Sequence, residues 1–332
     1  MTTNATARPI RRAIHVALSA LLGACALTAT TAGAQAWPSK PIRLIIGYGP
    51  GSGADIEARF LANYLGEAWN NPVVVEAKPG ASTVIGTDYV ARSAPDGYTF
   101  LVSTAAITTY ASLIKSVPVD PIKDLDPVSI LNDASPMLLV NNNVPAHTLP
   151  EFVAYAKANA GKLNYASAGR NTVLLMIESF KQAAGIQMTE VPYAGQGAYV
   201  TAFLRNDVQL IMASSQAAKP LLDDGRAKAI AAFGTARASN LPNVPTVGEQ
   251  GYPTLRGGGW YGVLAPHGTP RDIIDKFAAE MPKFAATPSQ KDRAAKGGFV
   301  WIASTPAQFR DQIAQDVKFW GDIANKANIK PE

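Results

Sequence analysis

The chain has 332 residues, enough for two domains of ordinary size with full hydrophobic cores. Its 47% hydrophobic and 17% charged residues are typical of a soluble globular protein. Three arginines and no acids lie in the first 36 residues, so the net charge of +5 falls by three to +2 for residues 37–332. A charge this small gives no reason to expect nucleic acid as a partner.

Residues 1–36 have the features of a cleaved signal peptide. A basic segment precedes the apolar run AIHVALSALLGACALTA, and AQA ends at Ala36 as a small-x-small cleavage site. Two alternatives stay open: an uncleaved membrane anchor, and a lipoprotein beginning at Cys25, since LLGAC fits a lipobox. We expect cleavage near Ala36 and a periplasmic protein. Cys25 is the only cysteine, so the mature chain would have no thiol for a disulfide, for catalysis or for a metal.

The first predicted elements are a strand over 42–48, a helix over 54–65 and a strand over 72–76. Gly49, Gly51 and Ala54 between the first two fit the pattern G-x-G-x-x-A, which suits either a dinucleotide or another anion at a helix N-terminus. Export weakens the alternative of an NAD-dependent Rossmann oxidoreductase, because nicotinamide cofactors stay in the cytoplasm. We therefore expect no cofactor. Ser52 and Asp55 are interpreted as a capping box that starts the helix.

The remaining elements continue the alternation of short strands and amphipathic helices. We predict helices over 83–92, 149–161, 172–185 and 217–224, strands over 97–104, 136–143, 162–168, 208–214, 227–234 and 259–266, and two or three C-terminal helices, the last over 306–327. The alternation indicates parallel α/β sheets. No Gly/Ser linker separates two independent domains, which indicates that the chain crosses between its two halves more than once.

A loop rich in Gly, Ser, Thr or Asn follows several strands and opens a helix. It occurs at 47–55, 79–86 and 167–172, with a variant at 192–197. Such loops gather at the C-terminal ends of strands, and each helix N-terminus suits an anion. The hydroxyls of these loops are read as helix caps that could also donate to a ligand. Arg170 is read as either a surface cation or a cleft residue, and Tyr193 as either core or cleft wall.

Enzyme signatures are sparse. No serine stands in a G-x-S-x-G pattern, there is no Walker A sequence, and His147 and His267 have no neighbours at metal-ligand spacing. We therefore assign no catalytic residue and no metal site, and expect a binding protein rather than an enzyme. The competing class is an exported hydrolase with an unrecognised site.

Several blocks together resemble one family. WPSKPIRLI, GPGSGAD, VVVEAKPGA, APDGYTFL, VDPIKDLDPVS, GKLNYASAG, VPYAGQ, LPNVPTVGEQGYP and GWYGVLAPHGTP resemble, in order, the substrate-binding proteins of tripartite tricarboxylate transporters, the Bug-type periplasmic receptors. The resemblance implies an α/β periplasmic binding protein of the Venus-flytrap, type II-like kind, with two lobes joined by two crossing strands. Lobe 1 would comprise 37–138 plus 249–332, and lobe 2 would comprise 139–248.

The resemblance also implies a monomer that holds a small carboxylate in the interlobe cleft and delivers it to membrane permease subunits or to a sensor. The implied ligand-binding residues are Tyr48, Gly49, Pro50, Gly51, Ser52, Gly53, Ser103, Thr104, Ser167, Gly169, Arg170, Asn171, Thr172 and Tyr193. One carboxylate would lie across the loops of both lobes, with Arg170 available to a second anionic group. Ala213 stands where the family often has Asp, which argues against an amino-acid ligand. Aromatic, aliphatic and tricarboxylic acids all stay open.

Overall fold

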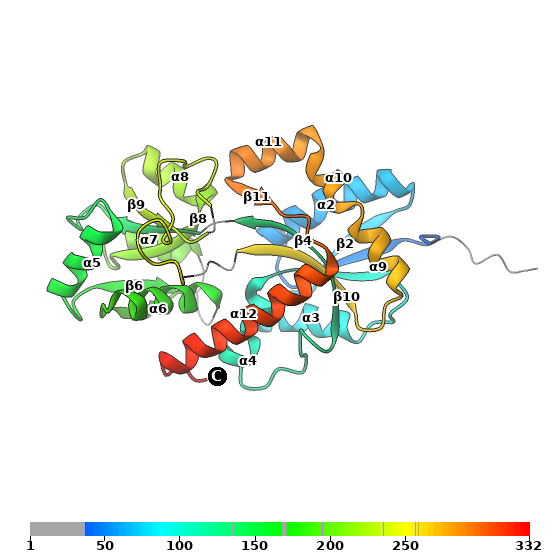
Figure 1. The fold of residues 1–332 in the computed structure, drawn as a ribbon, viewed down its shortest axis with the longest axis horizontal. Coiled ribbons are helices and arrows are strands. Elements are labelled where there is room, and N and C mark those ends of the chain that lie inside the picture. The colour runs from blue at the N-terminus through cyan, green and yellow to red at the C-terminus, as the bar shows by residue number, and fades with distance from the viewer. Residues whose placement is uncertain are drawn as a thin grey trace, which may run out of the picture. The chain divides into compact units, whose positions relative to one another are not determined.

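The computed structural model describes residues 37–134, 136–167, 171–193, 196–234, 236–255, 257 and 259–332. The predicted residues Gly169 and Arg170, and the expected signal peptide, lie outside these ranges. From Lys40 onward the described chain forms two mixed β-sheets with helices packed around each (Figure 1). No helix in the described ranges is long and apolar enough to cross a membrane.

The first sheet has six strands in the order β11-β4-β10-β3-β1-β2. Its strands are β1 (Ile42–Ile46), β2 (Val73–Ala77), β3 (Thr99–Thr104), β4 (Leu125–Ala134), β10 (Trp260–Pro266) and β11 (Phe299–Trp301). The helices of this part of the chain are α2 (Gly53–Trp69), α3 (Val84–Ala91), α4 (Tyr110–Leu113), α9 (Arg271–Ala278), α10 (Met281–Ala286), α11 (Pro288–Gly297) and α12 (Pro306–Lys326), with 3₁₀ helices η1 (Ala81–Thr83) and η2 (Ala105–Thr109).

The second sheet has five strands in the order β7-β6-β8-β5-β9. Its strands are β5 (Pro136–Asn141), β6 (Asn164–Ser167), β7 (Thr189–Pro192), β8 (Leu210–Ser214) and β9 (Ala227–Ala232). Its helices are α5 (Leu149–Ala158), α6 (Thr172–Ala184), α7 (Gln196–Leu204) and α8 (Ser215–Asp223).

The chain passes between the sheets twice, as predicted. β4 of the first sheet leads directly into β5 of the second, and the chain returns from β9 to β10. These strands pair antiparallel with their neighbours, so each sheet is mixed rather than purely parallel as expected. β4, β7, β11, α4 and α7 were not among the predicted elements.

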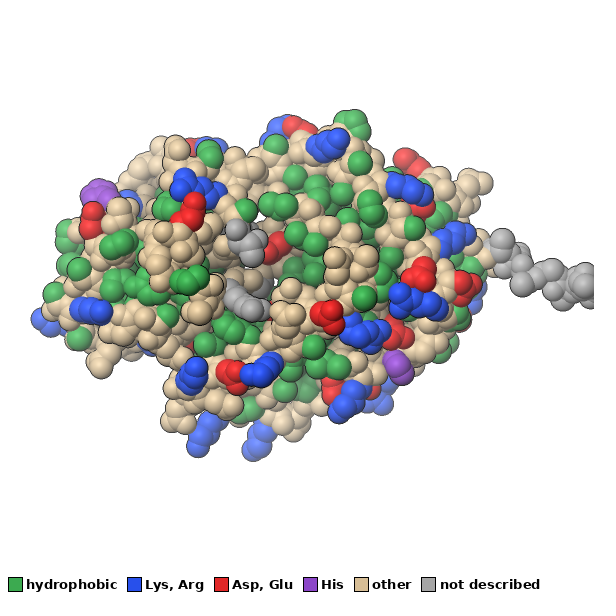
Figure 2. Space-filling model, viewed as in Figure 1, with side chains coloured by type: hydrophobic (Ala, Val, Ile, Leu, Met, Phe, Trp, Pro, Cys, Tyr) green, Lys and Arg blue, Asp and Glu red, His purple; other side chains and the backbone are tan. Residues whose placement is uncertain are grey.

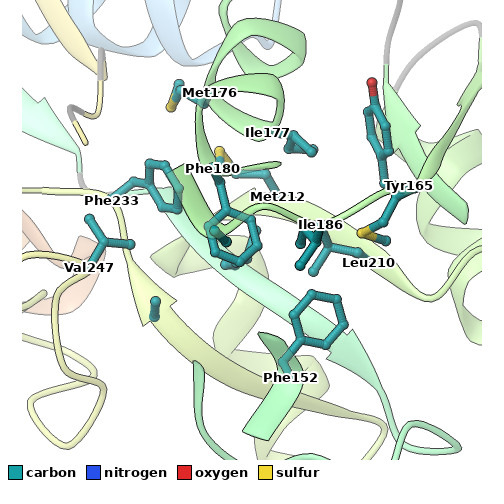
Figure 3. Packing of buried hydrophobic residues seen from close by; sticks show 14 of the residues in the cluster. Phe152, Tyr165, Met176, Ile177, Phe180, Ile186, Leu210, Met212, Phe233 and Val247 are labelled. Atoms are coloured by element: carbon teal, nitrogen blue, oxygen red, sulfur yellow. The ribbon is translucent and has the colours of Figure 1, made fainter. Parts of the chain in front are cut away.

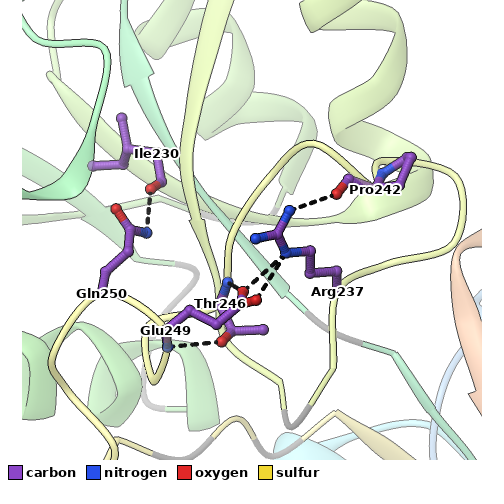
Figure 4. Close-up of polar contacts among 6 residues, drawn as sticks. All are labelled: Ile230, Arg237, Pro242, Thr246, Glu249 and Gln250. Atoms are coloured by element: carbon purple, nitrogen blue, oxygen red, sulfur yellow. Dashed lines mark hydrogen bonds and ion pairs between the residues drawn. The ribbon is translucent and has the colours of Figure 1, made fainter.

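The segment after β9 stays with the second sheet. Figure 4 shows Gln250 donating from Nε2 to the carbonyl of Ile230 in β9 at 2.9 Å, while Arg237 binds Glu249 at 3.0 Å. The Thr246 amide donates to the Glu249 carboxylate and the Glu249 amide to the Thr246 hydroxyl, which closes the turn. The first change of sheet therefore lies between β4 and β5, and the second lies after Gln250 and before β10.

Each sheet has its own hydrophobic core, and α12 contributes to both. Figure 3 shows the cluster under the second sheet, where Phe152 of α5 lies 6.3 Å from Phe180 of α6 between ring centroids. Trp320, near the end of α12, belongs to this cluster, whereas Phe309 near its start belongs to the cluster of the first sheet. A helix of 21 residues is about 31 Å long, which is enough to reach both.

Charged side chains on the surface are mixed in sign. Figure 2 shows Lys, Arg, Asp and Glu side chains interspersed over the face in view. Many form pairs one helical turn apart, such as Lys219 with Asp223 and Lys318 with Asp322, both at 3.0 Å. Exposed pairs of this kind contribute little to stability.

Candidate functional site

A cavity of about 260 Å³ is lined by residues from both sheets. The lining residues are Tyr48, Thr104, Ala106, Ala134, Pro136, Asn171, Thr172, Val173, Met176, Tyr199, Met212, Ala213, Ser214, Gly259 and Tyr261. Most polar members follow the C-terminal ends of strands β1, β3, β6 and β8, where loops open helices. This is the edge of an α/β sheet at which ligands ordinarily bind.

Three helix starts beside this cavity are capped by side chains that also line it. Thr104 Oγ1 accepts from the Ala106 amide, Asn171 Oδ1 from two amides of α6, and Ser214 Oγ from the Ala217 amide. A capping hydroxyl oxygen accepts with a lone pair and keeps its own hydrogen, and a capping asparagine keeps the hydrogens of its side-chain nitrogen. Each cap therefore satisfies a helix end while leaving its donor hydrogens directed to other partners.

The hydroxyls of Tyr48 and Thr104 form one hydrogen bond with each other, at 2.7 Å. Two hydroxyls carry two hydrogens, and their mutual bond uses one of them. The bond from the Ala106 amide to Thr104 uses neither, because the amide supplies its own hydrogen. One hydrogen of the pair is left to donate outward. Burial raises the pKa of Tyr48, so its phenol stays protonated at neutral pH.

Tyr261 of β10 adds another phenol donor to the cavity wall. Burial, followed by the negative charge of Glu57, raises its pKa to about 12, so it also stays protonated. Gly53 at the start of α2 makes room for it, because a Cβ at that position would lie 2.3 Å from the Tyr261 hydroxyl oxygen.

Glu57 is itself buried and held by Arg293 at 2.7 Å. Burial outweighs this partner and raises the pKa of Glu57.

In the Gly-rich loop before α2, a backbone amide donates to the carboxylate of Asp55 from the same chain. Ser52 Oγ accepts from the Asp55 amide at 3.3 Å, and Asp55 Oδ2 accepts from the Gly51 amide at 2.9 Å. Hydrogen bonds from Arg59 and then from Gly51 lower the pKa of Asp55, so it is ionised at the positive end of the helix. The structure thus confirms Ser52 as the cap of α2, but the Asp55 carboxylate accepts from the Gly51 amide and not from the Ser52 amide that a capping box requires. The helix end is already balanced by the negative charge of Asp55.

The remaining wall of the cavity is apolar. Val173 and Met176 come from the first turns of α6, and Met212 and Ala213 from β8. Within the described ranges, no charged side chain lines this cavity, and no group of three acid, His or Cys side chains could hold a metal ion. The arrangement suits a hydrogen-bond acceptor attached to an apolar body.

A second, larger cavity lies on the other face of the crossing strands. Successive residues of a strand face opposite sides, so Ala134 and Tyr261 line the cavity described above, whereas Asp133 and Trp260 line one of about 760 Å³. Trp260 donates to Asp316 of α12 at 2.9 Å in this second cavity. Asp133 and Asp316 therefore line a different cavity from the hydroxyls of Tyr48 and Thr104.

Comparison with known proteins identifies the family. The family model described as tripartite tricarboxylate transporter family receptor matches residues 57–329. The chain belongs to this receptor family. It is similar to protein BugT of Bordetella pertussis, with 32% identity over 300 residues that cover 90% of this chain and 92% of BugT.

Solved structures of periplasmic binding proteins match the fold of the chain. The periplasmic binding protein BugD has a TM-score of 0.75 and 28% identity, covering 89% of this receptor and 100% of BugD. A structure described as R. palustris Rpa4515 with adipate has a TM-score of 0.78 and 27% identity, with the same coverage. The predicted periplasmic-binding-protein fold and the predicted family are therefore confirmed, and the family is one of solute-binding receptors.

The structure brings only some of the predicted site residues of the receptor to the cavity. Tyr48, Thr104, Asn171 and Thr172 line it. The loop residues Gly49, Pro50, Gly51 and Ser52, and Gly53 at the start of α2, do not line it.

Three other predicted residues make internal contacts. Ser103 is 2% exposed, Ser167 is fully buried and donates to Glu190, and Tyr193 packs against the core of the second sheet. Gly169 and Arg170 lie outside the described ranges.

Several lining residues of the receptor were not predicted. They are the apolar residues Val173, Met176, Met212 and Ala213, and the polar residues Tyr199, Ser214 and Tyr261. Ser214 carried a usable signal, because it stands between a predicted strand and a predicted helix as the serines and threonines of the other loops do. The apolar residues carried none, because periodicity alone assigns them to the core.

Proposed function

We propose that the receptor is a periplasmic monomer that binds a small carboxylate in the cavity between its two sheets and delivers it to membrane permease subunits or to a sensor. The observation that carries the proposal is the set of donors from both sheets in a cavity without a described acid. The Tyr48–Thr104 pair and Tyr261 come from the first sheet, and Ser214 comes from the second. A carboxylate accepts from such donors with up to four lone-pair sites.

The scale of binding also favours contacts with both sheets. One helix N-terminus contributes about 0.3–1 kcal/mol, whereas micromolar affinity needs about 8 kcal/mol. Hydrogen bonds to a charged group contribute about 1.5–3 kcal/mol each, so three or four of them in a cavity that excludes water supply the difference. A ligand that joins donors of both sheets would favour the closed arrangement, which is the state a permease would recognise.

Two features of the cavity restrict the ligand. Ala213 and the absence of described acids leave an ammonium group without a negatively charged partner in the described lining, so we expect acids without an amino group. Met176 and Met212, which both line the cavity, favour an apolar body in the ligand. The similar structure from R. palustris is described with adipate, an acid of this kind.

The test is a thermal-shift screen of the exported receptor after unfolding and refolding to remove carried-over ligand. The panel pairs each carboxylic acid with its carboxamide and includes amino acids and NAD. An acid at a hundredfold excess over its Kd adds about 2.7 kcal/mol to the free energy of unfolding. We expect shifts from acids and none from their amides. Equal shifts from both, or a shift from NAD alone, would contradict the proposal.

A pair of cap variants then locates the site. Ser214→Ala removes a cap and a proposed ligand donor, whereas Thr148→Ala removes a cap at α5, far from the lining residues. Both should lower the melting temperature, since a lost cap costs about 1 kcal/mol. Only Ser214→Ala should weaken binding, by about tenfold or more. The ligand should be recovered unchanged by NMR, whereas an exported hydrolase would convert it.

A further inference from the structure

A second hollow of about 230 Å³ adjoins the carboxylate cavity. The two share Tyr48, Ala106 and Asn171 as lining residues, so they are neighbouring compartments of one cleft. The polar residues of the second hollow are Tyr48, Ser82, Thr83, Thr109, Tyr110 and Asn171, and no charged side chain in the described ranges lines it. A water molecule occupies about 30 Å³ of liquid, so this hollow has room for several non-hydrogen atoms of a ligand.

One wall of this hollow is a backbone segment in a rarely adopted conformation. After Gly80, the φ angles of Ala81, Ser82 and Thr83 are 45°, 53° and 77°. Three consecutive side-chain-bearing residues in the left-handed region are unfavourable, and such a segment persists only where its surroundings fix it.

The surroundings that fix this segment are two close backbone contacts. A Cβ on Gly47 would lie 2.7 Å from Cβ of Thr83, and one on Gly86 would lie 2.8 Å from Cα of Gly47. The two glycines thus press the start of α3 against the end of β1.

The hydroxyls around Thr83 form a closed chain. Thr87 donates to the Thr83 carbonyl at 3.0 Å, so its only hydrogen is used. Tyr110 must then be the donor to Thr87, at 2.9 Å, and Thr83 the donor to Tyr110, at 2.6 Å. Every hydrogen of these three hydroxyls is engaged inside the protein. They form a scaffold and have no donor left for a ligand.

Ser82 differs from these neighbours. It is exposed to the hollow, and its hydroxyl makes no hydrogen bond with any residue that the structure describes. Thr109, the other hydroxyl residue there, donates to the Ala106 carbonyl at 2.8 Å. The spare hydrogen of the Tyr48–Thr104 pair lies at the boundary between the compartments, so Ser82 is the donor that belongs to the second hollow alone.

We propose that this hollow is a second subsite, which takes the far end of the ligand, and that Ser82 selects ligands bearing an oxygen acceptor there. This inference rests on the proposed function, with the first carboxylate in the larger compartment. The ligand class is then an acid with an apolar middle and a second oxygen function, such as another carboxylate. The strained backbone serves to direct the Ser82 hydroxyl into the hollow.

The test compares monoacids with diacids of the same length by isothermal titration calorimetry of the refolded, exported receptor. The pairs are butyrate with succinate, hexanoate with adipate, octanoate with suberate, and 4-methylbenzoate with terephthalate. For at least one pair, the wild type should bind the diacid more tightly. Ser82→Ala should reduce the ratio of the two Kd values by about three- to tenfold, the effect of one hydrogen bond.

Two glycine variants separate the hydroxyl from the strain. Ala81→Gly and Ser82→Gly should both raise the melting temperature of the ligand-free receptor, because glycine adopts a positive φ readily. Only Ser82→Gly should also lose the preference for the diacid.

If monoacids and diacids bind equally to the wild type, or if Ser82→Ala leaves the ratio unchanged, the subsite is wrong and the carboxylate cavity stands. If no acid binds, the proposed function itself fails.

Discussion

Replacing Asp133 by asparagine should raise the free energy of unfolding at pH 8 by at most about 3 kcal/mol and change it little at pH 4. Burial, and then the negative charge of Asp316, raises the pKa of Asp133 from 3.8 to about 6. Between these two pKa values the folded protein holds a proton that the unfolded chain releases. The wild type therefore loses stability as the pH rises from about 4 to 6.

The magnitude follows from the shift of the pKa. About two units at about 1.36 kcal/mol each give the upper limit of about 3 kcal/mol, complete above pH 6. Asparagine carries no charge at any pH, and its amide oxygen can still accept the hydrogen bond from the Gly259 amide. The variant therefore removes the charge and keeps the geometry.

The assay is urea unfolding of both proteins at pH 4, 6 and 8. The dependence of the free energy of unfolding on urea concentration, the m-value, must be the same for both proteins. Asp322→Asn is the matched control, because Asp322 is an exposed residue of α12 that pairs with Lys318 at 3.0 Å. It should change stability by less than about 0.5 kcal/mol at each pH. A gain from Asp133→Asn that is equal at all three pH values, or a loss at pH 8, would refute the reasoning.

Three further predictions concern Tyr261 and the residues around it. Gly53→Ala should displace the Tyr261 phenol, since the new Cβ would lie 2.3 Å from its oxygen, and calorimetry should show carboxylate affinity reduced by about tenfold; unchanged affinity would contradict it. Tyr261→Phe should lower affinity by about tenfold or more with melting temperature almost unchanged, whereas equal affinity would exclude Tyr261 as a donor. Arg293→Met should destabilise the protein by about 3–5 kcal/mol in urea by leaving Glu57 buried without its partner, and Glu57→Gln should restore part of this loss; a neutral Arg293→Met would show that the pair is dispensable.

Features set by residues close together in the chain could be predicted from the sequence. Ser52 caps α2 by accepting from the amide three residues on, and the end of α6 at Gly185 follows from the left-handed conformation that glycine favours. The two crossings of the chain, by contrast, were expected from the family resemblance and the absence of a linker.

Features set by tertiary contact could not be predicted. β4 has no alternating pattern, because its residues are buried on both faces and Asp126 and Pro127 interrupt its apolar run. Ser103 and Thr104 are chemically alike in the sequence, but strand alternation directs only Thr104 to the cavity. Ser167 was expected to bind ligand, yet it donates to Glu190 on the neighbouring strand, a partner that no local pattern indicates.

The most direct test of a carboxylate-binding cleft is a crystal structure of the receptor with the tightest acid from the screen. The account predicts carboxylate oxygens within hydrogen-bond distance of Ser214 on the second sheet and of the Tyr48–Thr104 pair on the first. A carboxylate bound only outside this cavity, for example in the larger one lined by Asp133 on the other face of the crossing strands, would contradict it.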